Sequence, residues 1–590
     1  MSKPTAAVSS ALVIVAIGAT IHAQVGRGGS EWLTARGDAQ RTSWIRTDPK
    51  ISVESMSSPG FDLQWTAQLD TRARQVNGLT QGVTANGVTL FVPMSIIGGS
   101  ANTVYAIDND TGYLVWQRHF DVAIPASTPG CPAGMTAAAT RIVPLVPPPI
   151  TVPPAGGRAA QAYRSVIGEP GQGVPLETRG GGPGRGPAAP GAANPAGAAP
   201  PAAGPQRQGG DPAGRGVAPA PAGGGGGGRG NAGPSIPGAP PISAGGLGRP
   251  SGVVYAISSD GVLHVMGLQS GKDIQRPAEF FPANARWSDA IAVNTTLYTS
   301  TSGHCAGTPN GVWGIDLDSD AKPVVSWKSK DDLVGTLAFT SEGTVVVAET
   351  RGIVLLDGKT LQEKGSFSAN GAELVTGPTV FRHHDKEIVA AGTKDGRIVL
   401  LDATAAGGGT RSTPLYVSNP VAAGSSIVDG LATWQEMTIV PPPAPPPVSA
   451  AGPPPGPVGP PAPASVTLGT RWVLAPVSGA VVALKLTDSN GALALEPAWT
   501  AGNFSTPTTP IVVNGVVFAL SSGRPAAAAG AGTPAALRAL AGTTGKLLWD
   551  SGTAMKTSAS PGSFWSAMGQ LYVGTADGAV YAFGFTDERR

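Results

Sequence analysis

Residues Val104 to Trp116 read Val-Tyr-Ala-Ile-Asp-Asn-Asp-Thr-Gly-Tyr-Leu-Val-Trp, a short apolar run, a Thr-Gly turn and a second run that ends in Trp. The pattern returns from Leu537 to Trp549, again with Gly-x-x-x-Trp after a Thr-Gly turn. Looser copies lie at 312–327, 353–365, 398–404 and 580–585. A unit repeated at intervals of roughly 40 to 50 residues is typical of a propeller or a repeat array.

The composition of each copy favours strands over helices. Val, Ile, Leu and Tyr fill runs of about five residues bounded by Gly and Asp, which is too short for an ordinary helix. We expect the closing Trp to lie across the neighbouring unit and to bury its ring there. Asn-Gly or Asp-Gly pairs, which tolerate the positive φ of tight hairpin turns, occur at 77–78, 86–87, 260–261, 395–396, 490–491, 514–515 and 577–578.

The repeat Ala-Ile-Asp-x-x-Thr-Gly-x-x-x-Trp, read from Ala106 to Trp116, resembles the tryptophan-docking repeat of pyrroloquinoline quinone (PQQ) propellers. Such propellers occur in quinoprotein dehydrogenases and in the propeller lipoprotein of outer-membrane assembly. The stretch from Trp32 to Thr42 is similar to the lead-in that often precedes them. The resemblance implies a fold and leaves the activity open, because the same repeat serves enzymes and scaffolds.

Counting the units predicts an all-β, eight-bladed β-propeller over residues 61–585. The last unit ends after its third strand, so we expect Phe61 to Leu69 to complete that blade and close the ring. The expected blades are 79–120, 135–281 with an interruption, 284–330, 331–368, 375–418, 425–502, 505–552 and 557–585.

Two low-complexity tracts interrupt the predicted blades. Residues 147–250, in blade two, are mostly Gly, Pro and Ala with scattered Arg, and residues 441–464, in blade six, are nearly all Pro, Ala and Gly. Neither tract buries enough apolar surface to offset its chain entropy, so we expect both to be disordered. The arginines of the first tract would suit an anionic surface, whereas a tolerated loop insertion is the simpler interpretation.

The N-terminus predicts export. Residues 1–23 have the features of a Sec-type signal peptide, and residues 24–60 follow as a lead-in segment. No Cys lies near the cleavage site to carry a lipoprotein anchor, and no later apolar run is long enough to span a bilayer. We therefore expect a periplasmic monomer without a transmembrane segment. A net charge of +2 with only 13% charged residues argues against nucleic-acid binding.

The two cysteines, Cys131 and Cys305, fall in predicted loops that open on the same face of a propeller. An exported protein permits a disulfide between them. Two unpaired thiols are the other possibility, because the sequence does not give the Cα separation that a bridge requires. No Cys-Cys pair and no Cys-x-x-Cys-His occurs, so the vicinal disulfide common in PQQ alcohol dehydrogenases and a c-type haem site are both missing.

A dehydrogenase of this resemblance would need PQQ, a calcium ion and a base. Aromatic and polar candidates stand at the mouths of the predicted inner strands. Trp287 and Trp565 could form a floor for a planar quinone, or could be packing residues of the repeat. The candidates are Asp289 as base, Arg286, Trp287 and Trp565 for the cofactor, and Glu373 and Asn294 for calcium, with Asp429 and Glu436 as further acids.

His383 and His384 lie between two predicted strands of blade five, followed by Asp385 and Lys386. A metal site there would need further ligands, which the sequence does not identify. A polar surface loop is therefore the preferred interpretation.

Two functions remain. The first is an exported binding or scaffold protein that engages an envelope protein or a small ligand through its ring face, without a cofactor. The alternative is a PQQ-dependent dehydrogenase of an alcohol or sugar that donates electrons to a separate acceptor. Glu, Asn, Asp and Arg around a wide channel would favour the enzyme, and a channel plugged by apolar side chains would favour the scaffold.

Overall fold

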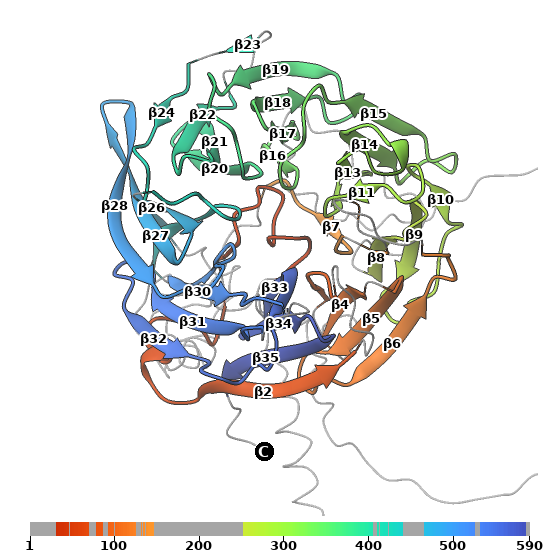
Figure 1. Ribbon diagram of the computed structural model, residues 1–590, viewed down its shortest axis with the longest axis horizontal. Coiled ribbons are helices and arrows are strands. Elements are labelled where there is room, and N and C mark those ends of the chain that lie inside the picture. Colours follow the sequence, from red (N-terminus) through yellow and green to blue (C-terminus); the bar gives the residue numbers. More distant parts are fainter. Residues whose placement is uncertain are drawn as a thin grey trace, which may run out of the picture. The chain divides into compact units, whose positions relative to one another are not determined.

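The computed structural model describes a ring of β-sheets (Figure 1). We call the space that the ring encloses the channel. The predicted signal peptide and both low-complexity tracts lie outside the described residues. The described residues are 31–46, 48–69, 78–85, 93–99, 101–124, 131, 134–135, 137–146, 252–404, 410–411, 413–422, 424–440, 465–525 and 532–585.

The strands of each blade follow one another from the channel to the rim. Blade one contains β3 (Val83–Ala85), β4 (Met94–Gly99), β5 (Thr103–Asp108) and β6 (Leu114–His119). Blade two contains β8 (Val253–Ile257), β9 (Val262–Gly267) and β10 (Ala278–Glu279). Blade three contains β12 (Ile291–Val293), β13 (Thr296–Ser302), β14 (Gly311–Asp316) and β15 (Val324–Lys328). Blade four contains β16 (Ala338–Phe339), β17 (Val345–Glu349), β18 (Gly352–Leu356) and β19 (Glu363–Ser368).

The second half of the ring has the same order. Blade five contains β20 (Thr379–His383), β21 (Lys386–Gly392), β22 (Ile398–Asp402) and β24 (Tyr416–Val417). Blade six contains β25 (Ala432–Val440), β26 (Ser465–Val477), β27 (Ala480–Ser489) and β28 (Ala492–Gly502). Blade seven contains β29 (Ile511–Val513), β30 (Val516–Ser521), β31 (Ala536–Ala541) and β32 (Leu547–Asp550). Blade eight contains β33 (Ala559–Ala567), β34 (Gln570–Thr575), β35 (Ala579–Phe585) and β2 (Phe61–Gln68).

The described residues form eight sheets, and the predicted all-β, eight-bladed propeller is confirmed. The described residues include two short helical turns, η1 (Ser55–Ser57) and η3 (Cys305–Gly307). Within the described part of the chain, no helix could cross a membrane. Four short strands extend the blades: β1 (Trp44–Ile45), β7 (Ile142–Val143), β11 (Arg286–Trp287) and β23 (Thr410–Arg411).

The ring closes in blade eight by pairing of the two ends of the propeller. β2 runs antiparallel to β35, with Phe61 opposite Phe585 and Gln68 opposite Ala579. This pairing covers the edge that β35 would otherwise expose. The apolar core lies between neighbouring sheets, where side chains of adjacent blades pack face to face, as in the cluster that joins blades two and three.

Three tryptophans of outer strands tie one blade to the next. Each indole covers a turn glycine whose φ is positive, and a Cβ on that glycine would lie 2.4–2.7 Å from the ring. The indole Nε1 also donates to a backbone carbonyl of the next blade, at 2.7–3.0 Å. The pairs are Trp65 on Gly112, Trp116 on Gly271 and Trp499 on Gly545.

Residues 31–46 of the lead-in segment run inside the ring, where they are the red chain in Figure 1. Its carbonyls accept hydrogen bonds from the amide of the second residue of five inner strands, at 2.8–3.0 Å. An inner strand has no neighbouring strand on its channel side, so these bonds satisfy amides that would lack a partner there. The donor and acceptor pairs are Thr84 to Trp32, Phe339 to Ala39, Val380 to Gln40, Thr433 to Thr42 and Val512 to Ser43.

The segment then reaches the last two blades. β1 pairs in parallel with β29 of blade seven. The Asp48 Oδ2 accepts a hydrogen bond from the amide of Gly569, in blade eight, at 2.7 Å. The channel is therefore crossed by the protein's own backbone.

Candidate functional site

The direction of the inner strands defines two faces of the ring. We call the face at which β12, β20 and β25 begin the mouth face, and the opposite face, at which they end, the hairpin face. Residues that precede an inner strand lie at the mouth face. Residues in the first hairpin turn of a blade lie at the hairpin face.

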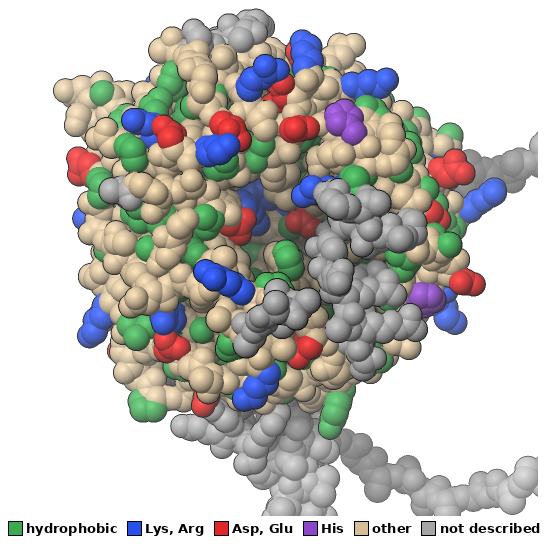
Figure 2. All heavy atoms as spheres, in the orientation of Figure 1, with side chains coloured by type: hydrophobic (Ala, Val, Ile, Leu, Met, Phe, Trp, Pro, Cys, Tyr) green, Lys and Arg blue, Asp and Glu red, His purple; other side chains and the backbone are tan. Residues whose placement is uncertain are grey.

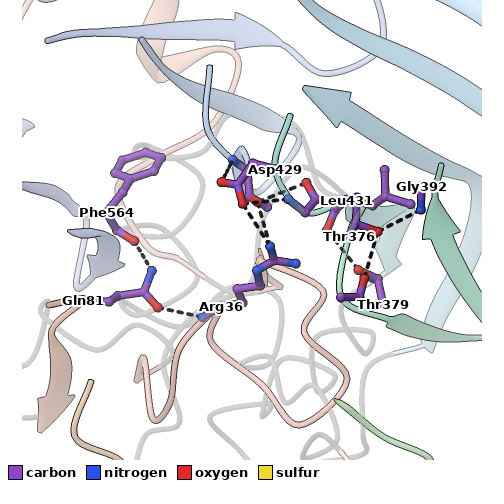
Figure 3. A network of polar contacts seen from close by, with 11 residues as sticks. Arg36, Gln81, Thr376, Thr379, Gly392, Asp429, Leu431 and Phe564 are labelled. Atoms are coloured by element: carbon purple, nitrogen blue, oxygen red, sulfur yellow. Dashed lines mark hydrogen bonds and ion pairs between the residues drawn. The ribbon is translucent and has the colours of Figure 1, made fainter. Parts of the chain in front are cut away.

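A polar cluster built around Arg36 occupies the channel at the mouth face (Figure 3). The Arg36 Nη2 donates to Thr509 Oγ1 at 3.0 Å and lies 3.5 Å from Asp429 Oδ1. The Arg36 amide donates to Gln81 Oε1 at 2.8 Å, and the Gln81 side chain donates to the carbonyl of Phe564. One residue of the lead-in segment thus connects blades one, six, seven and eight. In Figure 2, basic and acidic side chains lie in the hollow at the centre of the ring.

The ion pair depends on a glycine and leaves part of each partner available. A Cβ at Gly430 would lie 1.6 Å from Arg36 Nη2, so only glycine leaves room for the guanidinium. Asp429 accepts from the Gly430 amide through Oδ1 and from the Thr509 amide through Oδ2, both at 2.8 Å. The Asp429 side chain is 41% exposed and that of Arg36 is 15% exposed. Among the residues that the structure describes, Arg36 Nη1 is buried without a hydrogen-bond partner.

Threonines hold blade five against this cluster. Thr379 Oγ1 donates to the Leu431 carbonyl at 3.0 Å, and Thr376 Oγ1 accepts from the Gly392 amide at 2.8 Å. The first bond joins blade five to Leu431, two residues after Asp429, and the second lies within blade five (Figure 3). Sequence analysis named Asp429 as a further acid and missed its partner Arg36, because no motif marks a lone arginine in an irregular segment.

Asp289, the predicted base, also lies at the mouth face. Its Oδ1 accepts a hydrogen bond from the Ala138 amide at 2.8 Å, and the residue is half-buried. Its charge acts on Arg41, a fully buried residue whose Nε donates to the Leu337 carbonyl at 2.7 Å. Burial lowers the pKa of Arg41 to about 10, against the attraction of Asp289, which raises it. The negative charge of Asp289 therefore offsets part of the cost of burying the positive charge of Arg41.

The two tryptophans predicted as a cofactor floor lie in the core. Trp565 is 0% exposed, stacks on Tyr572 with ring centroids 5.3 Å apart, and donates through Nε1 to Ser95 Oγ at 3.0 Å. Trp287 is 4% exposed and packs on Phe281 at 5.4 Å. Neither indole offers an open face to a planar quinone, so the packing interpretation describes both. Arg286, beside Trp287 in β11, is exposed.

The structure places the two predicted calcium ligands on opposite faces of the ring. Glu373 precedes β20 at the mouth face, is exposed, and pairs with Lys394 Nζ at 2.8 Å. Asn294 has φ 53° in the first hairpin turn of blade three and lies at the hairpin face. Calcium needs its oxygen ligands within one coordination shell, which residues on opposite faces cannot provide. The further acid Glu436 accepts from Trp472 Nε1 at 2.8 Å within blade six.

A Ser-His-Asp arrangement that sequence analysis missed lies in blade two. Ser258 Oγ is 3.2 Å from His264 Nε2, and His264 Nδ1 is 3.1 Å from Asp273 Oδ1. Ser258 is 0% exposed, and burial lowers the pKa of His264. A nucleophile needs access to its substrate, so this buried network holds the blade together instead of acting on a substrate.

Cys131 and Cys305 form a disulfide, with Cα atoms 5.5 Å apart. Of the two possibilities that the sequence left open, the bridge is therefore the one present. It links the connection before blade two to the loop after β13 of blade three, at the mouth face.

The chain resembles the PQQ-like propellers in fold. No protein-family model and no curated protein matches the sequence. A similar solved structure is the quinohemoprotein alcohol dehydrogenase of Comamonas testosteroni, with 13% identity and a TM-score of 0.49, covering 97% of this chain and 83% of that one.

Two other similar structures are an enzyme, a methanol dehydrogenase, and the protein BamB. A europium-containing methanol dehydrogenase has 9% identity and a TM-score of 0.47, covering 95% of this chain and 99% of that one. BamB of Moraxella catarrhalis has 15% identity and a TM-score of 0.37, covering 57% of this chain and 81% of that one. None of these similarities assigns an activity to this chain.

Proposed function

We propose that the protein is an exported, periplasmic binding protein that engages an envelope protein or a small ligand through the mouth face of its ring. One observation carries the proposal: the two indoles best placed in sequence to bind a quinone, Trp287 and Trp565, are buried in the core. The lead-in segment also crosses the channel, and the exposed Asp429 beside Arg36 presents polar groups at its mouth. Such a surface suits a polar partner.

The alternative is a PQQ-dependent alcohol or sugar dehydrogenase. It is favoured by Arg36 Nη1, a buried donor without a partner among the described residues, which suits an anionic group such as a carboxylate. The predicted floor and calcium ligands do not fit the cofactor, because Trp287 and Trp565 are covered and Glu373 and Asn294 lie on opposite faces. The binding function is therefore the better supported of the two.

A calorimetric titration of the purified protein with PQQ and calcium separates these functions. If the protein is the proposed binding protein, titration with PQQ should give no saturable heat of binding. Cooperative unfolding of the same sample shows that the protein is folded. One-site saturable binding of PQQ would favour the dehydrogenase, and oxidation of alcohols or sugars with an artificial electron acceptor would then overturn the binding proposal.

Photo-crosslinking in cells tests the mouth face directly. A photoreactive residue at His304, an exposed position in the loop after β13, reports on this face. The same residue at Asn294, exposed in the first turn of the same blade, reports on the hairpin face. We expect discrete adducts from position 304 and none from position 294. Equal adducts from both positions, or none from position 304, would contradict a partner at the mouth face.

A further inference from the structure

The hairpin face carries a side-chain cluster unrelated to the channel mouth. His383 ends β20 and His384, with φ 53°, occupies the turn before β21 in blade five. Asp488 lies near the end of β27 in blade six, in a hairpin whose strands pair from Ala480–Gly502 to Ser489–Ala492. This hairpin projects past the neighbouring strands in Figure 1. Its length brings Asp488 to the turn of the adjacent blade.

The three side chains converge on one point. His383 Nε2 is 3.4 Å and His384 Nε2 is 3.7 Å from Asp488 Oδ2. All three ligand atoms lie within 4.8 Å of one another. Ligands on a tetrahedral zinc ion, about 2.1 Å from the metal, are about 3.4 Å apart. Two of the three separations are thus close to those of a bound ion, and the His384 side chain, 70% exposed, is free of packing that would prevent the remaining adjustment.

The ligand atoms are also oriented before any ion arrives. Asp488 Oδ1 accepts a hydrogen bond from the Gly491 amide at 2.7 Å, which leaves Oδ2 facing both imidazoles. Among the described residues, His383 Nε2 is buried and has no hydrogen bond of good geometry, its contact with Asp488 Oδ2 being the 3.4 Å approach. A buried imidazole nitrogen beside a carboxylate is short of an electron-pair acceptor, which a metal ion would supply.

The surroundings shift the pKa values of His383 and Asp488 downward. Burial lowers the pKa of His383, and the charges of His384 and Arg471 lower it further. The hydrogen bond from the Gly491 amide lowers the pKa of Asp488. Metal ions bind the neutral form of an imidazole and the ionised form of a carboxylate.

We propose that His383, His384 and Asp488 bind a divalent transition-metal ion, Zn²⁺ in the first place. Two imidazoles and one carboxylate are a donor set that zinc accepts, with a fourth position open to water, whereas calcium and magnesium prefer oxygen ligands. The ion joins the turn of blade five to the hairpin of blade six. Sequence analysis placed the histidines in a surface loop because Asp488 is more than 100 residues further along the chain.

Equilibrium dialysis of untagged, chelator-treated protein against Zn²⁺, with metal analysis, tests the site. We expect one tightly bound ion per chain. His384→Ala removes an exposed side chain, so it should fold normally and weaken binding by at least about 10–100-fold, since loss of a ligand costs no less than loss of a supporting residue. Asp488→Asn should weaken binding similarly. His304→Ala, which removes an exposed histidine in blade three, should leave binding unchanged.

Co²⁺ supplies a second readout that does not depend on affinity. Bound Co²⁺ should give the intense visible absorption of a tetrahedral site in the wild type and in His304→Ala, and lose it in His384→Ala. The proposal is overturned by the absence of stoichiometric Zn²⁺ in the wild type. It is equally overturned if His304→Ala lowers binding as much as His384→Ala does, because the ion would then bind to surface histidines in general.

Discussion

The indole of Trp116, in the outer strand of blade one, lies so close to Gly271 of blade two that a Cβ on the glycine would be 2.4 Å from the ring. Gly271 also has φ +63°, a conformation that costs other residues backbone strain. The contact therefore requires glycine for two separable reasons, steric and conformational.

Gly271→Ala should destabilise the propeller because the added methyl group displaces the Trp116 ring. Gly371→Ala is the matched control, since Gly371 has φ +88° with nothing within 4 Å of its Cβ position. We expect Gly271→Ala to lower the free energy of unfolding by about 1–3 kcal/mol more than the control does. Urea unfolding of both variants measures the difference. Equal losses would mean that backbone strain alone matters at position 271.

Hydrogen bonds between Asn514 of blade seven and the lead-in segment give a second prediction. Asn514 Nδ2 donates to the carbonyls of Asp48 and Ile51, at 2.6 and 2.8 Å. Asn514→Ala removes both donors from buried acceptors and should lower the free energy of unfolding by about 1–3 kcal/mol. Asn294→Ala controls for turn strain, because Asn294 has a similar positive φ in the equivalent turn of blade three and is exposed. The idea fails if denaturant unfolding shows the two variants to be equally stable.

The Cys131–Cys305 bridge joins residues 174 positions apart. Reduction, or the double change Cys131→Ser and Cys305→Ser, should lower the free energy of unfolding by about 2–5 kcal/mol, since the bridge restricts the unfolded chain. Thermal unfolding with and without reductant measures this loss. The double variant serves as the control, because reductant should not change its stability further. A wild type insensitive to a reductant that demonstrably frees both thiols would contradict the prediction.

His264 makes stability depend on pH. Burial lowers the pKa of His264 below the value of about 6.5 found in unfolded chains. Between the two values the unfolded state binds the extra proton, so the free energy of unfolding falls as the pH drops below about 6.5. In His264→Gln, which keeps a polar side chain and does not titrate, the fall should be smaller. Denaturant unfolding from about pH 7.5 to about pH 5.5 checks this. Parallel curves for the two proteins would exclude His264 as the source.

The strands could be predicted because their signals are local. Apolar runs, Thr-Gly turns and closing tryptophans repeat along the chain, so one well-formed copy near Trp116 makes the others recognisable. The face of the ring on which a residue lies can also be predicted from the sequence. Asn294 follows an inner strand and Glu373 precedes one, so the two lie on opposite faces.

The polar site could not be predicted in the same way. Arg36 reaches Asp429 through an irregular segment with φ 60° at Arg36 itself, a path that no periodicity encodes. The burial of Trp565 depends on Gly82 of the neighbouring blade, whose Cβ would be 2.5 Å from the indole. Such distances arise from packing between blades, which the spacing of residues along one blade does not determine.

The threading of the lead-in segment through the ring also sets an order of events in time. A ribosome produces Trp32 early, yet its segment ends against Gly569, a residue 521 positions after its partner Asp48. The lead-in segment is therefore synthesised first but can complete its contacts only after blade eight has been made. Contacts of such long range in sequence make folding slow. A chain that stops short of blade eight lacks both the partner of β2 and the Gly569 amide that binds Asp48. The ring can therefore close only after blade eight has been synthesised.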